Sequence, residues 1–293
     1  MCNVGKCGYS GQDTDSMKLY YWQGPKGNFG DDLNPWLWEK LLPGCFDSDE
    51  SKVFFGIGTI LGTWNPDGHK IVFGSGCGYM KPPKLDDSWQ VYCVRGPLTA
   101  SALGLDKNLA ITDPASLLAT LGKEEIPSIG QRFRIGFAPH HWDMEYGVPW
   151  QRLCSSFGIE LIDPYACVEE TLTKIRGCEL ILAEAMHAAI VADTFRIPWI
   201  PVCLFRHILD FKWHDWCASM NLTYKPHYTW PLLRAEPGPK ERIVRMPLAV
   251  QAVARLRWIA ANAEPVLSNH ETLASHNARL IELLERFRKV YIQ

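Results

Sequence analysis

Long apolar runs are missing from this sequence of 293 residues. The longest apolar stretch, LILAEAMHAAIVA, is interrupted by Glu184 and His187, whereas a membrane span needs about 20 consecutive apolar residues. The N-terminal segment MCNVGKCGYSGQDTDS also lacks the apolar core of a signal peptide. We therefore expect a cytoplasmic protein whose folded part begins near Met17.

An excess of basic residues is missing as well. The net charge is −2, and the lysines and arginines are spread along the chain. A nucleic-acid-binding protein usually carries a basic excess or a basic stripe. Nucleic acid is therefore not an expected partner.

Closely spaced cysteine pairs are also absent. The ten cysteines form no CxxC motif, and the adjacent His140 and His141 have poor geometry for binding one metal ion together, so the sequence predicts no metal site. Four cysteines lie in or beside apolar runs, which is typical of buried free thiols in a reducing cytoplasm. They are Cys77, Cys93, Cys178 and Cys203.

The sequence does contain an alternation of short apolar runs with helical patterns. The apolar runs are continuous, which is typical of strands buried on both faces of a parallel sheet. The predicted strands cover residues 18–22, 52–58, 70–76, 90–96, 109–112, 134–140, 159–163, 178–184 and 199–205. Helices are predicted between them, including 168–177, which ends on Gly177, and 187–197, which is followed by Pro198. This alternation predicts an α/β fold built from βαβ units.

A polar break at residues 122–131 divides the pattern. We predict one Rossmann-like domain over residues 17–122 and a second over residues 131–216. The remaining segment, 217–293, has helical periodicity at 245–262 and 270–292. The apolar stripe of its last helix, which includes Leu280 and Phe287, predicts that this helical segment packs on the body.

The stretch GNFGDDLNPW follows the first predicted strand, and ligands bind open α/β sheets beyond the carboxyl ends of their strands. Its glycines, Gly30 among them, allow the backbone to approach a ligand closely. Asp31 or Asp32 could accept a proton from a sugar hydroxyl, or could simply cap a turn. Asn34 and Pro35 predict that a helix begins there.

Two further glycine-rich turns follow neighbouring strands, at residues 56–62 and 74–79, and the second contains Gly76. Such turns can hold an anion with backbone N–H groups. Arg95 ends the next predicted strand, where a guanidinium can clamp a carboxylate or phosphate, or form an ion pair on the surface. Together these features predict a substrate cleft.

The second half of the chain offers several histidines. His187 lies between an apolar strand and a helix rich in small residues, a suitable place for a catalytic histidine, although a lone histidine is often a core residue. His140 and His141 end another predicted strand on the same side of the second domain. Downstream of the last strand, Arg206, His207 and Lys212 are possible anion contacts.

Six motifs occur in this order: GNFGDDLNPWL, GIGTIL, VFGSG, VRGPLTA, ITDPA and AEAMHAAIVADTFRIPW. Together, over residues 18–216, they resemble the polysaccharide pyruvyltransferase family, and in particular its members that ketalise exopolysaccharides such as succinoglycan. The resemblance implies two Rossmann-like domains facing a cleft, as in B-type glycosyltransferases. It also implies transfer of the carbon skeleton of phosphoenolpyruvate onto two sugar hydroxyls without a cofactor, giving a cyclic pyruvate ketal and phosphate.

The resemblance suggests roles for these residues. His187 is the expected proton donor, and Asp31 or Asp32 is expected to hold a sugar hydroxyl. The expected acceptor contacts are Asn28, Gly30, Gly76, His140 and His141. The expected donor contacts are Arg95, Arg206, His207 and Lys212. Many family members carry an arginine two residues before the histidine, but this sequence has Ala185 there. Arg206, His207 and Lys212 are therefore the candidates to hold the donor instead.

Two other functions stay open at the level of sequence. One is a nucleotide-sugar-dependent glycosyltransferase of the same fold, for which Glu184 is the strongest candidate to bind the ribose. The other is a non-catalytic sugar-binding protein. A lipid-linked oligosaccharide acceptor would add a peripheral association with the inner face of the membrane.

Overall fold

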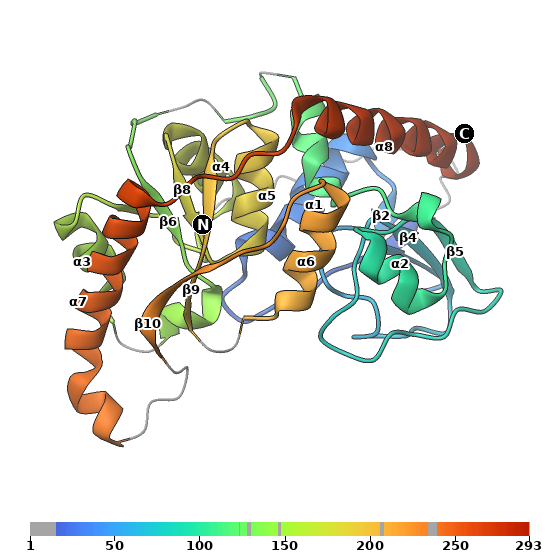
Figure 1. Cartoon of the computed structure of the whole chain (residues 1–293). Coiled ribbons are helices and arrows are strands. Elements are labelled where there is room, and N and C mark those ends of the chain that lie inside the picture. Colours follow the sequence, from blue (N-terminus) through green and yellow to red (C-terminus); the bar gives the residue numbers. More distant parts are fainter. Residues whose placement is uncertain are drawn as a thin grey trace.

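The computed structural model describes residues 16–122, 124–127, 130–145, 148–205, 208–233 and 239–292. Two five-stranded parallel sheets, each accompanied by helices, make up the molecule (Figure 1). The first sheet uses strands from Met17 to Cys93, and the second uses strands from Gly136 to Leu233. The predicted α/β class with parallel sheets is confirmed.

The first sheet has the strand order β2-β1-β3-β4-β5. Its elements are β1 (Met17–Tyr20), α1 (Phe29–Leu41), β2 (Phe46–Asp47), β3 (Lys52–Phe55), β4 (His69–Phe73), β5 (Trp89–Cys93), α2 (Pro97–Leu103) and the 3-10 helices η1 (Lys107–Leu109) and η2 (Pro114–Thr120). The prediction of a strand at residues 109–112 is wrong. The segment between η1 and η2 is so short that only a single bridge forms, between Ala110 and Val94.

The second sheet has the strand order β10-β9-β8-β6-β7. Its elements are β6 (Gly136–Ala138), η3 (His141–Glu145), α3 (Trp150–Ser156), β7 (Glu160–Leu161), α4 (Val168–Gly177), β8 (Ile181–Ala183), α5 (Met186–Thr194), β9 (Trp199–Phe205), α6 (Asp210–Ser219), β10 (His227–Leu233), α7 (Pro239–Asn262) and α8 (His270–Tyr291). Residues 217–293 were predicted as a helical segment with helices at 245–262 and 270–292, and the structure adds strand β10 ahead of these helices. In this edge strand, Tyr228 pairs in parallel with Cys203 of β9. Aromatic residues such as Tyr228 favour the extended conformation of a strand.

Both sheets share one topology when their strands are numbered along the chain, because each then has the order 2-1-3-4-5. In this arrangement the chain switches direction between the first and third strands, and ligands bind beyond the carboxyl ends of these two strands. The switch-point strands are β1 and β3 in the first sheet and β6 and β8 in the second. The topology alone therefore directs attention to the four segments that follow them.

Helix α1 begins earlier than predicted. Asn28 is its N-cap, and Pro35 lies inside the helix, not at its first position. A proline there leaves the carbonyl of Asp31 without its usual N–H partner, and the side chain of Asn34 donates to that carbonyl at 3.2 Å. The same buried side chain donates to the carbonyl of Ile57 at 2.9 Å and accepts its N–H at 2.8 Å. Asn34 therefore replaces a lost helical bond and ties α1 to the segment after β3.

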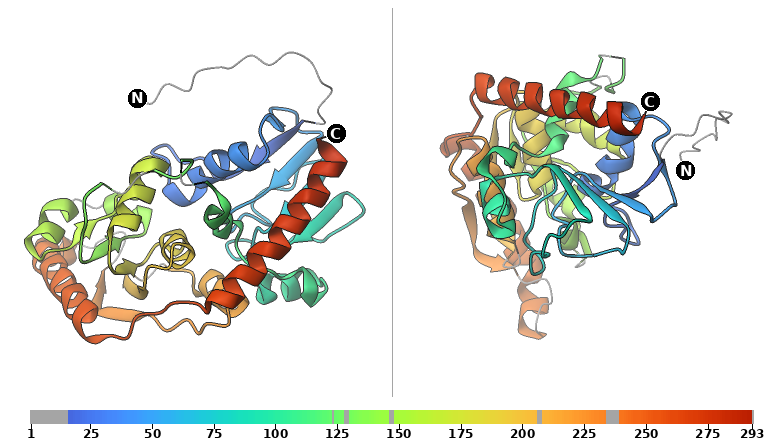
Figure 2. Two further views of the ribbon diagram at one scale, coloured as in Figure 1. Left: turned by 90° about the horizontal axis from the view of Figure 1, so that it is seen from above. Right: turned by 90° about the vertical axis from the view of Figure 1, so that its right-hand side faces the viewer.

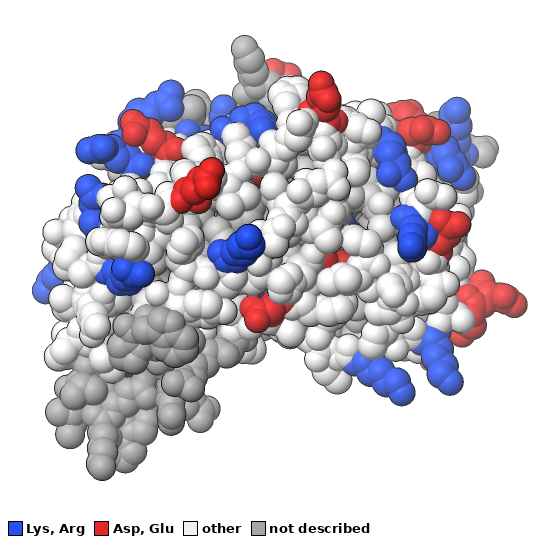
Figure 3. All heavy atoms as spheres, viewed as in Figure 1, with Lys and Arg blue, Asp and Glu red and all other residues white. Residues whose placement is uncertain are grey.

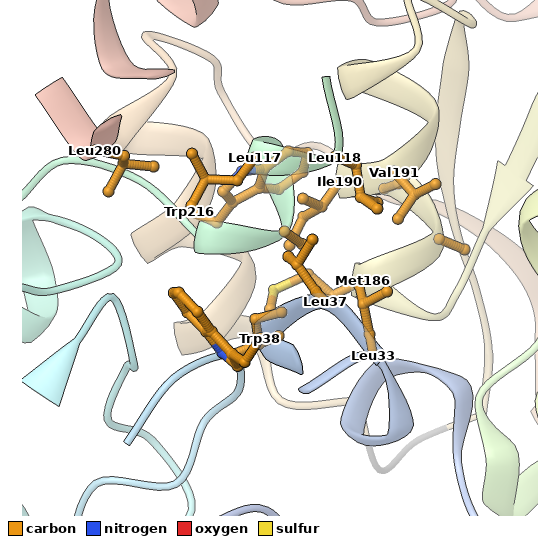
Figure 4. Close-up of a cluster of buried hydrophobic side chains, with 14 of the residues drawn as sticks. Leu33, Leu37, Trp38, Leu117, Leu118, Met186, Ile190, Val191, Trp216 and Leu280 are labelled. Carbon is orange, nitrogen blue, oxygen red and sulfur yellow. The ribbon is translucent and has the colours of Figure 1, made fainter. Parts of the chain in front are cut away.

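One hydrophobic core continues from the first sheet to the second. Figure 4 shows side chains of α1, η2, α5 and α6 packed together. Those labelled from the first two elements are Leu33, Leu37, Trp38, Leu117 and Leu118, and those from α5 are Met186, Ile190 and Val191. The small residues Ala188, Ala189 and Ala192 of α5 are also buried there, and they allow close packing of α5. This shared core fixes the position of the two sheets relative to each other.

The two C-terminal helices cover different sheets. Helix α7 packs against β9, β10 and α3, whereas α8 lies along the first sheet (Figure 2). The ring of Phe287 lies 5.5 Å from Phe54, 6.4 Å from Phe73 and 5.5 Å from Tyr92. The predicted apolar stripe of the last helix is buried.

The surface carries charges of both signs. On the face seen in Figure 3, lysines and arginines are interspersed with aspartates and glutamates. Over the part of the chain that the structure describes, no helix has the length and apolar character needed to cross a membrane. The four cysteines predicted to be free and buried are confirmed as such.

Candidate active site

A cavity of about 380 Å³ lies between the two sheets. Its walls come mainly from the segments that follow β1, β3, β6 and β8, the switch-point strands of the two sheets. In residue numbers these segments are 22–31, 59–63, 138–142 and 185–188. The two ligand-binding edges that the topology predicts therefore open into a single cavity.

The N-terminus of α1 contributes one acidic group to the cavity. Asn28, Gly30 and Asp31 line it, and the side-chain amide of Asn28 donates to the Asp31 carboxylate. Burial raises the pKa of Asp31, an effect that the neighbouring His187, the Asn28 hydrogen bond and Lys212 oppose. Asp32 does not line the cavity; its carboxylate accepts the backbone N–H of Asn28 at 3.0 Å. Of the two predicted aspartates, the structure thus places Asp31 in the cavity and Asp32 at the helix end.

His187 lies directly against this acidic end. A Cβ atom on Gly30 would be 2.1 Å from Nδ1 of His187, so a glycine is needed for α1 and α5 to approach this closely. On the other side of the ring, Nε2 lies 3.7 Å from Oδ2 of Asp113. Asp113 is fully buried, and its Oδ1 accepts the N–H of Ala115 at 3.0 Å. The imidazole therefore lies against the Asp113 carboxylate and close enough to Asp31 to interact with it electrostatically.

Sequence reasoning missed the role of Asp113. The signal was present, because this residue lies in the ITDPA motif, one of the six that carry the family resemblance. No role followed from the motif alone, since the partner His187 is far away in sequence. The structure brings them together because η2 packs against α5.

The N-terminus of α5 differs from that of α1. Its N-cap is Ala185, no described side chain caps it, and its first turn contains no acidic residue. Residues 185–188 all line the cavity. The first N–H groups of a helix have no intrahelical partner and carry a partial positive charge. This end of the cavity is therefore suited to an anion.

Lys212 supplies a cation to the same cavity. It projects from α6, lines the cavity and is only 8% exposed. Its ammonium group donates to the hydroxyl of Tyr79 at 3.0 Å and lies 5.5 Å from the centre of that ring. Lys212 was one of the predicted donor contacts, and the structure places it where it can meet a ligand.

Arg95 does not reach the cavity. Its side chain is fully buried, and it donates from Nε to Asp215 at 3.1 Å, from Nη1 to Thr59 at 2.7 Å and from Nη2 to the carbonyl of Cys77 at 3.3 Å. A Cβ atom on Gly76 would lie 2.2 Å from the guanidinium, so Gly76 makes room for Arg95 and is not a wall of the cavity. The expected contact of Arg95 with a donor does not fit this position. Arg95 instead orients the hydroxyl of Thr59, which does line the cavity.

Asp215 connects the two halves of the chain. Besides Arg95, its carboxylate accepts the backbone N–H groups of Leu98 and Thr99, each at 2.9 Å. It therefore caps α2, whose own N-cap is Gly96 and offers no side chain. Because Asp215 and Lys212 lie on the same helix, this cap also holds Lys212 at the cavity.

The remaining sequence candidates fall into two groups. His140 and His141 line the cavity with their rings stacked 4.5 Å apart. Arg206 and His207 lie outside the described residues. Within the described residues, no group of three or more histidine, cysteine, aspartate or glutamate side chains could hold a metal ion.

Glu184 is not a wall of the cavity. It is fully buried, and its Oε1 accepts the N–H groups of Leu204 at 2.6 Å and Phe205 at 3.1 Å. It also forms a side-chain hydrogen bond with Asp143, and burial raises the pKa of Asp143 to about 8 and that of Glu184 well above its usual range. Both residues are fully buried and neither lines the cavity, so a nucleotide ribose bound in the cavity would not contact this carboxyl pair.

Comparison with known proteins points to one family. A family model described as polysaccharide pyruvyl transferase matches residues 83–202, which include Asp113 and His187. The succinoglycan biosynthesis protein ExoV of Rhizobium meliloti (strain 1021) is 34% identical over 319 residues, covering 94% of this chain and 100% of the relative. No solved structure matches the chain significantly. The chain therefore belongs to the polysaccharide pyruvyl transferase family, and it is an enzyme of that class.

Proposed function

We propose that this enzyme transfers the pyruvyl group of phosphoenolpyruvate to two hydroxyls of one sugar in an exopolysaccharide precursor, giving a cyclic ketal and phosphate. The scaffold would be two Rossmann-like halves, arranged as in B-type glycosyltransferases. One observation carries the proposal: a bare helix N-terminus with His187 and Lys212 faces a helix N-terminus that carries Asp31, in one cavity. The relative's name, a succinoglycan biosynthesis protein, supports an exopolysaccharide as the product.

The donor belongs at the α5 end. Phosphoenolpyruvate carries close to three negative charges, and such an anion is stabilised by helix N–H groups and a buried cation. The first turn of α5 and the ammonium group of Lys212 offer both. With Ala185 in place of the arginine that many relatives carry, these two features are the described substitutes for it.

The chemistry needs one acid and one base near C2 and C3 of the donor. His187 gives its proton to the C3 methylene, which becomes a methyl group, while the Asp31 carboxylate takes the proton of the first sugar hydroxyl as its oxygen bonds to C2. The C2–O bond to phosphate then breaks, and the second hydroxyl oxygen bonds to C2. One of the two hydroxyl protons returns to His187, and the other leaves with phosphate. Positioned acids and bases typically contribute about 10²–10⁴-fold each.

Asp113 orients the acid. Its carboxylate faces Nε2 of His187 at 3.7 Å, which leaves Nδ1, on the Gly30 side of the ring, as the nitrogen nearer the acceptor. Asp113 itself is fully buried, so it acts through the histidine and does not touch substrate. This arrangement follows the general logic in which a buried carboxylate holds a catalytic imidazole in one orientation.

The experiment that tests the proposal compares donors. The purified enzyme is incubated with depyruvylated succinoglycan oligosaccharides, free or lipid-linked, and with either phosphoenolpyruvate or a UDP-sugar. We expect phosphate release and a pyruvylated oligosaccharide by mass spectrometry only with phosphoenolpyruvate. Sugar transfer from the UDP-sugar without any pyruvyl product would overturn the proposal in favour of a glycosyltransferase.

The place of the reaction is part of the same proposal. Phosphoenolpyruvate is a cytoplasmic metabolite, so a cytoplasmic enzyme would meet its donor there. A lipid-linked acceptor would bring the reaction to the inner face of the membrane. Faster turnover of the lipid-linked acceptor than of its free oligosaccharide would support this location, and equal rates would contradict a membrane-bound acceptor.

A further inference from the structure

Four neighbouring aromatic rings, the aromatic row, lie in the wall of the cavity. The row consists of Trp22, His141, His140 and Trp142, all of which line the cavity. The ring centres of Trp22 and His141 are 5.4 Å apart. His141, His140 and Trp142 form a triangle with sides of 4.5 Å, 5.4 Å and 5.5 Å. The two outer indoles remain 42% and 43% exposed. The row therefore presents apolar ring surface to solvent at the rim of the site, and its two ends come from different halves of the chain.

The row is held in place by its surroundings. A Cβ atom on Gly24 would lie 2.0 Å from the indole of Trp22, so the absence of a side chain at Gly24 is what allows this indole to fold back. Tyr165 donates its hydroxyl to the carbonyl of His141 at 2.7 Å. Beneath the row, the Asp143–Glu184 hydrogen bond joins η3 to the sheet. A preorganised surface of this kind loses little freedom when a ligand binds.

The chemistry of the row points to a sugar ring. Exposed aromatic surface gathered at a cavity usually marks a binding site, yet the trianionic donor has no apolar face to place on it. A pyranose ring does have one, because its C–H bonds point to one face while its hydroxyls lie around the edge. Tryptophan combines a large apolar surface with a polar N–H, which suits such a ligand.

The size of the cavity indicates which sugar lies there. At about 380 Å³, the cavity is near the lower end of the range for small-molecule sites. It has room for the small donor and the sugar that receives it, but further sugars of a chain must lie at the opening. Trp22, Trp142 and Tyr79 are exposed aromatic side chains of the cavity, and Tyr79 is held by Lys212 at the proposed donor end.

We propose that the aromatic row is a glycan subsite, which holds the sugar next to the one that is pyruvylated and makes the enzyme select an oligosaccharide over a single sugar. The inference rests on the proposed function for the identity of the acceptor. A membrane surface would contact convex parts of the molecule, whereas both indoles line a cavity, so a glycan is the favoured occupant.

The test uses the variants Trp22→Ala and Trp142→Ala, with Trp258→Ala as the matched control. Trp258 is 50% exposed on α7 and stacks on Arg255 at 3.9 Å, and it is not part of the cavity. Two acceptors are compared: depyruvylated succinoglycan oligosaccharides, and the methyl glycoside of the sugar that is pyruvylated. Steady-state kinetics are measured for each acceptor and for phosphoenolpyruvate, and calorimetric titration follows oligosaccharide binding without donor.

We expect each cavity variant to raise the KM for the oligosaccharide by about three- to tenfold, the scale of one aromatic contact. The KM for the single sugar, the KM for phosphoenolpyruvate and kcat should stay close to wild type, and Trp258→Ala should change none of them. Trp22→Phe should restore part of the loss, because a smaller ring can still stack. An unchanged KM for the oligosaccharide in both variants, or equal rises for both acceptors, would overturn the subsite.

Two further outcomes separate this inference from the proposed function. If wild type binds the oligosaccharide through both tryptophans but never transfers pyruvate, the subsite stands and the proposed function fails. If transfer is normal and neither tryptophan affects the acceptor, the subsite alone fails. Loss of binding to phosphatidylglycerol vesicles in both variants, with glycan binding unchanged, would assign the row to a lipid surface and overturn the proposal.

Discussion

Helices α1 and α5 begin at the same cavity, yet their first turns are chemically opposite. The end of α1 carries Asp31 and Asp32 behind the N-cap Asn28, whereas α5 begins after Ala185 with no described capping side chain. Acidic side chains neutralise the positive end of a helix from within the protein, but a bare end leaves that charge for a ligand. The difference separates a side of the cavity suited to a sugar hydroxyl from a side suited to an anionic donor.

The connections that lead into the two helices explain the difference. Strand β8 ends at Ala183 and α5 begins at Met186, so almost no residues are left to supply a cap. Strand β1 ends at Tyr20 and α1 begins at Phe29, and this longer loop delivers Asn28. Two sheets of the same strand order thus produce two helix ends of different chemistry.

The largest expected effect comes from removing the acid at the bare end. His187→Gln keeps the approximate size of the side chain and one polar contact but cannot give a proton. We expect kcat to fall by about 10²-fold or more, with donor affinity mostly kept, because Lys212 and the first turn of α5 remain. Steady-state and single-turnover rates would measure this.

The control for that variant is His214→Gln, which alters an exposed histidine on α6 and should leave turnover unchanged. Near-normal turnover of His187→Gln would contradict the proposed role. His187 would then be a core histidine, and the acid would have to be sought at His140 or His141.

Replacing each of the two aspartates separately by asparagine tests the acidic end of the cavity. Asp31→Asn should lower kcat/KM by up to about 10²-fold, because it removes the base. Asp32→Asn should lower kcat/KM only a few-fold, because it weakens the hydrogen bond at the start of α1 and leaves the base in place. Burial raises the pKa of Asp31, and its carboxylate must be ionised to act as a base. In the wild-type pH–rate profile, activity should therefore fall on the acidic side at a pH above the ordinary pKa of aspartate, which is about 4. Asp32→Asn should keep this part of the profile. A larger loss in Asp32→Asn would reverse the assignment.

Placing an acidic residue at the N-terminus of α5 should have opposite effects on the stability of the protein and on donor binding. Ala185→Asp places an acid at the N-cap of α5, which typically stabilises a helix by about 0.5–2 kcal/mol, so the melting temperature should rise. The same charge repels the donor, and the KM for phosphoenolpyruvate should rise by roughly tenfold, or about 1.4 kcal/mol. Ala185→Asn is the matched control, since asparagine caps equally well without a charge. If both variants impair the donor equally, the bare end matters for its shape and not for its charge.

The smallest expected effect on turnover concerns the carboxyl pair Asp143–Glu184, because neither residue lines the cavity. Burial raises the pKa of both Asp143 and Glu184, and that of Asp143 to about 8. Below about pH 4 the folded and unfolded chains both hold these protons; between there and about pH 8 the unfolded chain releases protons that the folded chain keeps, so the wild type loses stability as pH rises. In Glu184→Gln the amide can still accept from Leu204 and Phe205 and can donate to Asp143.

Relative to wild type, Glu184→Gln should therefore gain unfolding free energy as pH rises, by at most about 1.4 kcal/mol per pH unit for the group removed. Urea denaturation at a series of pH values measures the difference. Glu179→Gln changes an exposed glutamate of the same segment and should run parallel to wild type. A Glu184→Gln curve that also runs parallel would show that the pair does not hold these protons.

Local signals predicted several elements closely. Helix α4 was expected at 168–177 and spans Val168–Gly177, and β9 was expected at 199–205 and spans Trp199–Phe205. In both, the periodicity and the terminating residues act within a few positions of each other. The start of α1 was missed because Asn34–Pro35 has the form of an N-cap followed by a first helical residue. In the structure Asn34 lies inside α1, and its side chain bonds to Ile57, 23 positions away, instead of capping a helix.

The sequence by itself determined the type and order of most elements, the family motifs and the candidate status of Asp31 and His187. The tertiary structure alone decided which cation meets the ligand. Arg95 and Lys212 were equally good candidates in sequence, yet Arg95 is turned inward onto Asp215, 120 positions away, and Lys212 faces the cavity. The cause is the packing of α6 against α2, which buries one charge with its partner and leaves the other at the site. Periodicity acts over a few residues and cannot encode a partner that two separate sheets must first bring together.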